Sequence, residues 1–181
     1  NYLGDISTKR FHDQYCSAMM HLEFGVLKKK YADKLTFGYT HAQNKKNYQH
    51  PDNGILRPFG AYYTLGNTNL VSANYSKVVN NFKISAYVLG GRIIESIVDT
   101  STKKYNWAGD FITRQPDDAR GELVERRSFF ELTDLVLNSS FGTEWYIKEE
   151  HTVTFNFTQN YLERTGEDEV DELNRSFESP N

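Results

Sequence analysis

Apolar and polar side chains alternate along much of the chain, most clearly in CSAMMHLEFGV at residues 16–26. Every second residue from Cys16 to Val26 is apolar, and the residues between them are polar or glycine except for Met19. A period of two residues is typical of a β-strand with two unlike faces. The same kind of pattern predicts strands at 16–27, 35–40, 68–78, 82–90, 123–147 and 152–162.

Short and long connections alternate between the predicted strands. The short ones are 28–34, 80–81 and 148–151, and the long ones are 44–67, 99–121 and the segment from 165 onward. Successive connections of an antiparallel meander lie at opposite ends of the sheet, so all short turns are expected at one end and all long loops at the other. The four prolines fall in the long loops, where they remove no ladder hydrogen bond. The predicted fold is an all-β antiparallel meander, with a short helix over 163–175 as the one helical alternative.

The apolar face either forms the core of a water-soluble β protein or faces lipid on the outside of a barrel. No apolar run approaches the roughly 18 residues of a membrane helix, but membrane strands are only half apolar, so a membrane barrel is not excluded. The opposite face is rich in Ser, Thr, Asn and Gly, which suits a polar lumen. Aromatic residues gather near the short turns, as at a membrane interface, namely Tyr31, Phe82, Trp145 and Tyr146. Together with the sorted loops, these features favour part of a large transmembrane β-barrel.

The number of predicted strands bounds the domain organisation. Single-chain membrane barrels begin at about eight strands, and the pattern predicts six. We therefore expect residues 1–181 to be part of one β-barrel domain whose remaining strands lie elsewhere in the same polypeptide or in another chain. The opening NYLGDISTKR contains no secretion signal, which fits a removed signal or a start inside the protein.

Charge and motifs argue against several classes of function. The net charge of −3 and the lack of a basic stripe disfavour nucleic-acid binding. The chain contains no nucleophile, metal or nucleotide motif, and its five histidines are dispersed. We therefore expect a non-enzyme without catalytic residues, metal or cofactor. Cys16 is expected to be a buried, inert thiol, and the acidic stretch GEDEVDE at 166–172 a solvated loop, with a weak divalent-cation site as the alternative.

Aromatic residues in the long loops are the candidate ligand contacts, because their rings offer flat surfaces for stacking. The main candidates are Tyr62, Tyr63, Trp107 and Phe111, and Phe59 and Tyr105 lie in the same loops. Mutual packing of these rings is the alternative.

The segments LEFGV, YADKLTFGYT, YQHPDNGILRPFG, VDTSTKKYNWAGDF and YLERTGEDEVDELN, in this order, resemble the barrel of TonB-dependent outer-membrane receptors. The strand and loop sequences are most similar to those of the large receptors through which bacteria import complex nutrients. The resemblance implies a barrel of about 22 strands with an internal plug domain and a location in the cell outer membrane. It also implies active uptake of a scarce ligand such as a metal chelate, vitamin, glycan or peptide.

The partners implied by this resemblance are outer-membrane lipid, the TonB energy-transducing system acting through the plug, the nutrient ligand, the remaining barrel strands and a surface lipoprotein. The family has no catalytic residues to carry over. Its plug, its TonB-contacting box and its C-terminal aromatic strand are not among these 181 residues, as expected for a barrel segment. Two alternatives stay open: a secreted or soluble β-sandwich or barrel that acts as an adhesin or carbohydrate-binding module, and a barrel that anchors a surface complex.

Overall fold

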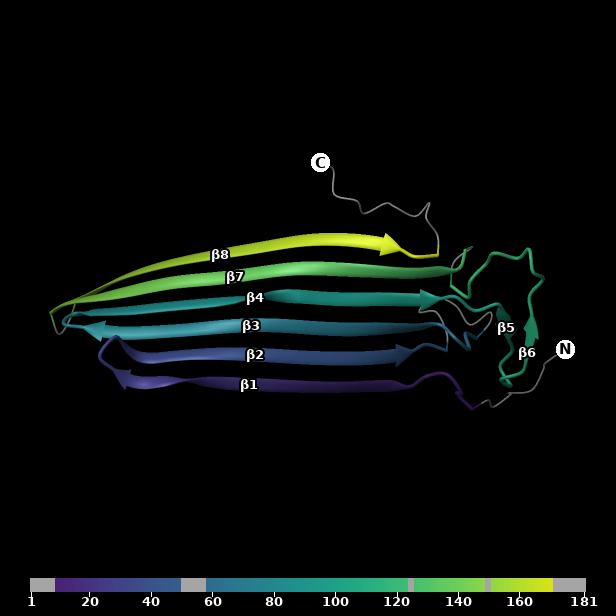
Figure 1. Cartoon of the computed structure of the whole chain (residues 1–181), viewed down its shortest axis with the longest axis horizontal. Coiled ribbons are helices and arrows are strands. Elements are labelled where there is room, and N and C mark those ends of the chain that lie inside the picture. The colour runs from purple at the N-terminus through teal and green to yellow at the C-terminus, as the bar shows by residue number, and fades with distance from the viewer. Residues whose placement is uncertain (1–8, 50–57, 124–125, 149–150, 171–181) are drawn as a thin grey trace.

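The chain forms one long, six-stranded antiparallel sheet in meander order (Figure 1). The computed structural model describes residues 9–49, 58–123, 126–148 and 151–170. The sheet contains β1 (Tyr15–Lys29), β2 (Ala32–Asn47), β3 (Tyr63–Val79), β4 (Phe82–Asp99), β7 (Ser128–Lys148) and β8 (His151–Asp168), each paired with its neighbours in this order. A separate hairpin of β5 (Lys103–Tyr105) and β6 (Phe111–Thr113) lies between β4 and β7 along the chain. The predicted all-β antiparallel meander is therefore confirmed.

The strands are longer than the alternating pattern predicted. The predicted loop 44–67 shrinks to 48–62, and the connector 28–34 shrinks to a turn at 30–31. The helical alternative for 163–175 is wrong for its described part, because β8 continues to Asp168; residues 171–175 lie outside the described residues. The fifth strand begins at Ser128 rather than at 123. Side-chain alternation fades before the strands end, whereas the backbone ladder continues through polar positions such as Gln43 and Lys45.

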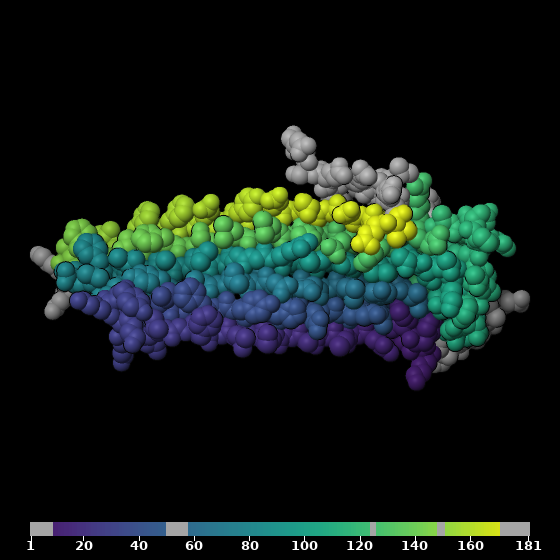
Figure 2. Space-filling view, viewed as in Figure 1, coloured from purple at the N-terminus to yellow at the C-terminus, as the bar shows by residue number. Residues whose placement is uncertain are grey.

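The connections are sorted as expected. The two-residue turn at 80–81 is confirmed, with Val79 opposite Phe82 and with Asn80 at a φ of 51°, which asparagine tolerates better than most residues. This turn, the turn after β1 and the paired strand ends Lys148 and His151 lie at one end of the sheet (Figure 1). The described residues of the β2–β3 loop, 48–49 and 58–62, and the β5–β6 hairpin lie at the opposite end (Figures 1 and 2). We call these the turn end and the loop end.

The sheet is a single layer with little core. The solvent-accessible surface is 13560 Å², whereas a compact chain of this mass exposes about 9,000 Å². Five apolar side chains are buried among the described residues, namely Ala32, Phe59, Tyr62, Val98 and Phe130. All except Ala32 lie at the loop end. Most apolar side chains of the sheet therefore have no partner layer within the described structure.

Two neighbouring glycines in β4 provide a matched test of the close strand packing. A Cβ at Gly91 would lie 2.1 Å from Asn69 O and 2.8 Å from Leu70 Cα, whereas a Cβ at Gly90 would come no closer than 3.3 Å to any neighbour. We expect Gly91→Ala to destabilise the protein by about 1–3 kcal/mol, because backbone atoms of β3 must move. Gly90→Ala should change the free energy of unfolding much less. Equal shifts of the urea unfolding midpoint for the two variants would contradict this packing.

Candidate functional site

The two faces of the sheet differ in chemistry. Cross-strand pairing places Leu22, Tyr39, Val71, Gly90, Leu137 and Tyr161 in one row. We call the face that carries this row face A, and the opposite face face B. Face A has a broad belt of exposed apolar side chains on the turn half of the sheet. Its most exposed members include Phe24 at 69%, Val71 at 59% and Phe155 at 56%.

The apolar belt of face A ends at a polar row. His41, Asn69 and Arg92 lie side by side in this row on β2, β3 and β4, and Glu163 lies in the same row on β8. Asn69 Oδ1 accepts a hydrogen bond from the Tyr39 hydroxyl at 2.8 Å and lies 2.9 Å from His41 Nδ1. Beyond this row towards the loop end, face A mixes polar side chains such as Gln43, Lys45 and Asn67 with apolar ones such as Ile94 and Val98. The belt therefore ends at this row on β2, β3, β4 and β8, whereas on β1 apolar side chains continue through Met20 and Ala18 to Cys16.

Face B is mainly polar along its whole length. Its turn half is dominated by uncharged hydroxyl and amide side chains, including Thr36, Ser72, Asn74, Ser76, Ser85, Asn138, Ser140, Asn156, Thr158 and Asn160. Its loop half carries the apolar side chains Leu70, Ile93, Val136 and Leu162 among polar ones such as Asn44, Thr68, Glu95, Asp134 and Arg164. Face B therefore stays mainly polar on both sides of the level at which the belt of face A ends. An ordinary amphipathic sheet keeps one apolar face along its whole length.

Aromatic side chains mark the turn end, as the sequence predicted. The rings of Phe82 and Trp145 stack on face A with centroids 5.6 Å apart and planes inclined by 9°. Tyr31 is 61% exposed in the first turn. Tyr146 lies on face B instead, where its hydroxyl donates to Glu144, which also pairs with Lys83 at 2.8 Å. Three of the four expected interface aromatics therefore lie at face A or in a turn.

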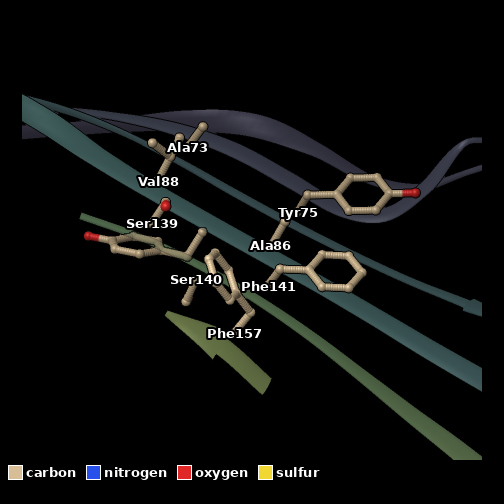
Figure 3. A pocket seen from close by; sticks show the side chains of 9 residues that line it. Ala73, Tyr75, Ala86, Val88, Ser139, Ser140, Phe141 and Phe157 are labelled. Carbon is tan, nitrogen blue, oxygen red and sulfur yellow. The ribbon is translucent and has the colours of Figure 1, made fainter. Parts of the chain in front are cut away.

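A shallow hollow of about 370 Å³ lies within the apolar belt (Figure 3). The small side chains Ala73, Ala86 and Ser139 leave room between larger ones on β3, β4, β7 and β8. Tyr75, Val88, Phe141 and Phe157 surround it. Its lining is almost entirely apolar, so it offers hydrocarbon contact rather than chemistry.

Two of the predicted ligand-contact residues have structural roles. Tyr62 is only 9% exposed, and its ring centroid lies 5.3 Å from that of Tyr48 and 5.5 Å from that of Phe59. Tyr63 is the first residue of β3 rather than a loop residue, and Lys45 Nζ lies 4.2 Å from its ring centroid. For Phe59 and Tyr62, mutual packing is what the structure describes.

The other two candidates, Trp107 and Phe111, share the β5–β6 hairpin. Asn106 Oδ1 holds the hairpin turn by accepting hydrogen bonds from the backbone N–H groups of Ala108 and Asp110, each at 2.9 Å. The Phe111 ring lies 5.7 Å from that of Tyr105, and Lys103 Nζ lies 3.9 Å from its centroid. A hollow of about 210 Å³ beside these rings is lined by Lys104, Tyr105, Asn106, Asp110, Phe111 and Ile112.

Sequence reasoning missed Phe11, whose ring lies 6.1 Å from that of Tyr105. The two residues are far apart in sequence, and no local pattern indicates the contact. Burial raises the pKa of the Tyr105 hydroxyl, and the negative charge of Glu122 adds to this effect. Half-exposed Phe111 and strongly exposed Ile112 give the hairpin an apolar surface on β6.

No family model, curated protein or solved structure matches this chain. In the described ranges there is no helix that is long and apolar enough to cross a membrane. The same ranges contain no group of three or more side chains able to hold a metal ion.

Several smaller expectations can be compared with the structure. Cys16 is exposed on face A, so the prediction of a buried thiol is wrong for this sheet. His21 Nδ1 lies 2.8 Å from Thr40 Oγ1 on face B, and its Nε2 lies 4.0 Å from Glu23.

The acidic stretch is part of β8 up to Asp168, which is buried and accepts hydrogen bonds from Ser128 Oγ at 2.5 Å and from Phe129 N at 3.2 Å. Asp171 and Glu172 lie outside the described residues.

Asp118 in the loop before β7 provides a pH test of the loop end. The Arg120 guanidinium and the Arg120 backbone N–H, with Arg114 nearby, hold the pKa of the Asp118 carboxyl well below its usual value of 3.8. Because the folded pKa is lowered, these contacts stabilise the loop above pH 3.8 and are lost as the pH falls through the folded value. We expect an NMR titration of the carboxyl carbon to give a midpoint below 3.8. A midpoint at or above that value would contradict the pairing.

Proposed function

We propose that this chain is a segment of an outer-membrane transport barrel, with face A towards lipid, face B towards the lumen and the loop end outside the cell. The observation that carries the proposal is the exposed apolar belt of face A, which ends at a polar row on β2, β3, β4 and β8. A lipid layer of limited thickness demands an apolar outer surface only over its own height. Beyond that height the outer surface meets water. The polar row of His41, Asn69 and Arg92 on face A fits such an exposed position.

The height of the apolar belt supports this orientation. On face A, alternate residues are apolar from Cys16 to Val26 on β1 and from Phe82 to Val88 on β4. A tilted membrane strand needs about 9–11 residues to cross the hydrocarbon core. The six sheet strands have between 15 and 21 residues, so each exceeds the crossing length. On β4 the residues beyond the belt lie towards the loop end.

Transport is proposed because the sequence resembles TonB-dependent receptors. In the proposal, the small polar side chains of face B line the lumen and contact a plug domain through which TonB delivers energy. The β5–β6 hairpin, with Trp107 and Phe111, contacts the nutrient ligand outside the cell, and a surface lipoprotein is a further partner. Binding and passage need no catalytic group, so the chain is proposed to be a non-enzyme.

The sheet edges support the presence of further strands. β1 and β8 each pair with a single strand in the described sheet. Unpaired backbone groups cost several kcal/mol each in lipid, so an open edge does not persist there. We therefore propose that both edges pair with the remaining strands of a larger barrel, as the resemblance implies.

A secreted or soluble β-sandwich is the second candidate, because a second sheet packed on face A would equally cover its exposed belt. Strands of sandwiches usually have about 3–10 residues, whereas these have 15 or more. A sandwich core also gives no reason for the apolar belt of face A to end at a polar row part-way along β2, β3, β4 and β8. A barrel that anchors a surface complex shares the proposed orientation and differs only in the absence of transport.

Arginine substitutions distinguish lipid from water at face A. We expect Phe155→Arg to cost roughly 2–4 kcal/mol in folding into a bilayer, because the charge would lie within the apolar belt of face A. Asn156→Arg and Ser140→Arg, on face B, should cost less. The measurement is the free energy of folding of the whole protein into lipid vesicles. Equal free-energy costs for substitutions on the two faces would contradict the membrane assignment.

Cysteine labelling of intact cells tests the orientation. In a Cys16→Ser background, Ile112→Cys at the loop end should react with a membrane-impermeant maleimide. Tyr31→Cys at the turn end should react only after the cells are opened. Both wild-type side chains are more than 60% exposed, so a difference in labelling reports the compartment rather than burial. Labelling of both positions on intact cells would refute the proposed sidedness.

A further inference from the structure

The β2–β3 loop is tied to the segment before β7 by one buried carboxylate. Glu122 is 3% exposed. Its Oε1 accepts a hydrogen bond from Gly60 N at 2.9 Å, and its Oε2 accepts from Ala61 N at 2.8 Å and from Tyr62 N at 2.7 Å. Hydrogen bonds to an ionised acceptor are stronger than those between neutral groups. Three consecutive backbone donors of one loop therefore depend on a side chain that is 60 residues away.

A second buried carboxylate fixes the position of Glu122. Asp99, the last residue of β4, is 1% exposed and accepts hydrogen bonds from Glu122 N at 2.5 Å and Leu123 N at 2.8 Å. Gly121 allows this approach, because a Cβ there would lie 2.2 Å from Asp99 Oδ2. The end of β4 thus positions Asp99, Asp99 positions the backbone of Glu122, and the Glu122 carboxylate holds residues 60–62 of the β2–β3 loop.

The N-terminal segment and the β5–β6 hairpin join the same assembly. Gln49 is 2% exposed, and its Oε1 accepts from Phe11 N at 2.7 Å and His12 N at 3.1 Å. Tyr105 packs so closely on Gly60 that a Cβ at Gly60 would lie 2.4 Å from its ring. The Phe11 ring lies next to the ring of Tyr105. Segments before β1, between β2 and β3, and between β4 and β7 are thus held together at one end of the sheet.

We propose that the loop end is a preformed platform rather than a set of independent lids, and that Glu122 is its positioning residue. The platform holds the exposed β6 residues Phe111 and Ile112 of the hairpin at a fixed place relative to the sheet. The nutrient ligand of the proposed function binds there without the entropic cost of ordering these loops, which increases affinity for a given contact area. The inference rests on contacts at the loop end and holds whether or not the sheet lies in a membrane.

The test measures the position of the hairpin directly. Spin labels at Ile112→Cys and Leu135→Cys, in a Cys16→Ser background of the whole protein, report the distance between the hairpin and β7 by pulsed electron paramagnetic resonance. The parent protein should give one narrow distance distribution. Glu122→Gln should broaden it, because a glutamine has one acceptor oxygen and its NH₂ group then faces backbone donors. The thermal unfolding of the sheet should change little, which separates positioning from a general loss of fold.

Glu131→Gln is the matched control. Glu131 lies on β7 near the same end and accepts a hydrogen bond from Ser96 Oγ, with no backbone donor bonded to its carboxylate among the described contacts. This variant should keep the narrow distribution. Gly60→Ala is a second variant that acts on the platform without changing charge, because its methyl group would displace the Tyr105 ring, and it should broaden the distribution.

Hydrogen exchange of the parent protein gives an outcome that needs no variant. Amides 60–62 should be protected in the parent protein, and in Glu122→Gln they should exchange about 10- to 100-fold faster, the factor expected for one lost charge-assisted hydrogen bond. A broad distance distribution or rapid exchange of these amides in the parent protein overturns the proposal. A narrow distribution that survives both Glu122→Gln and Gly60→Ala also overturns it.

Discussion

A continuous antiparallel backbone ladder is the constraint on which the rest of this structure depends. The ladder fixes the register of six strands, and register decides which side chains from distant parts of the sequence share a row and a face. A slip of one residue between any two strands would move every following side chain to the opposite face. The apolar belt, the polar row above it and the hydroxyl-rich opposite face exist only in this register.

The sheet and the loop end are stabilised in different ways. The described sheet gains its order from backbone pairing and leaves its large apolar belt uncovered, so its environment must supply the apolar contact. The loop end has the buried side chains Phe59, Tyr62, Val98 and Phe130 and the buried carboxylates of Asp99 and Glu122. It therefore behaves as a small core of its own, attached to the ends of β2, β3 and β4.

The limited height of the apolar belt on face A connects these two parts to the proposed function. Below the row of His41, Asn69 and Arg92, face A is suited to hydrocarbon and face B to water or hydrogen-bonding groups. Above that row, face A gains polar side chains such as Gln43, Lys45 and Asn67, and face B stays mainly polar. A strand that passes out of a lipid layer meets this change of surroundings on its outer face. A strand within a single soluble core does not.

The sequence by itself determined the strand type, the antiparallel order and the sorting of turns and loops, because a period of two residues and the lengths of connections are local properties. It also placed Phe82, Trp145 and Tyr31 at the turn end. It did not determine where the strands end, since backbone pairing continues through polar positions such as Lys45 that carry no alternating signal. Nor did it separate Tyr62, which packs in the loop-end core, from Phe111, which stays exposed. Only the tertiary structure decided these points, because burial of an aromatic ring or of Glu122 depends on neighbours that are distant in sequence and that the fold brings together.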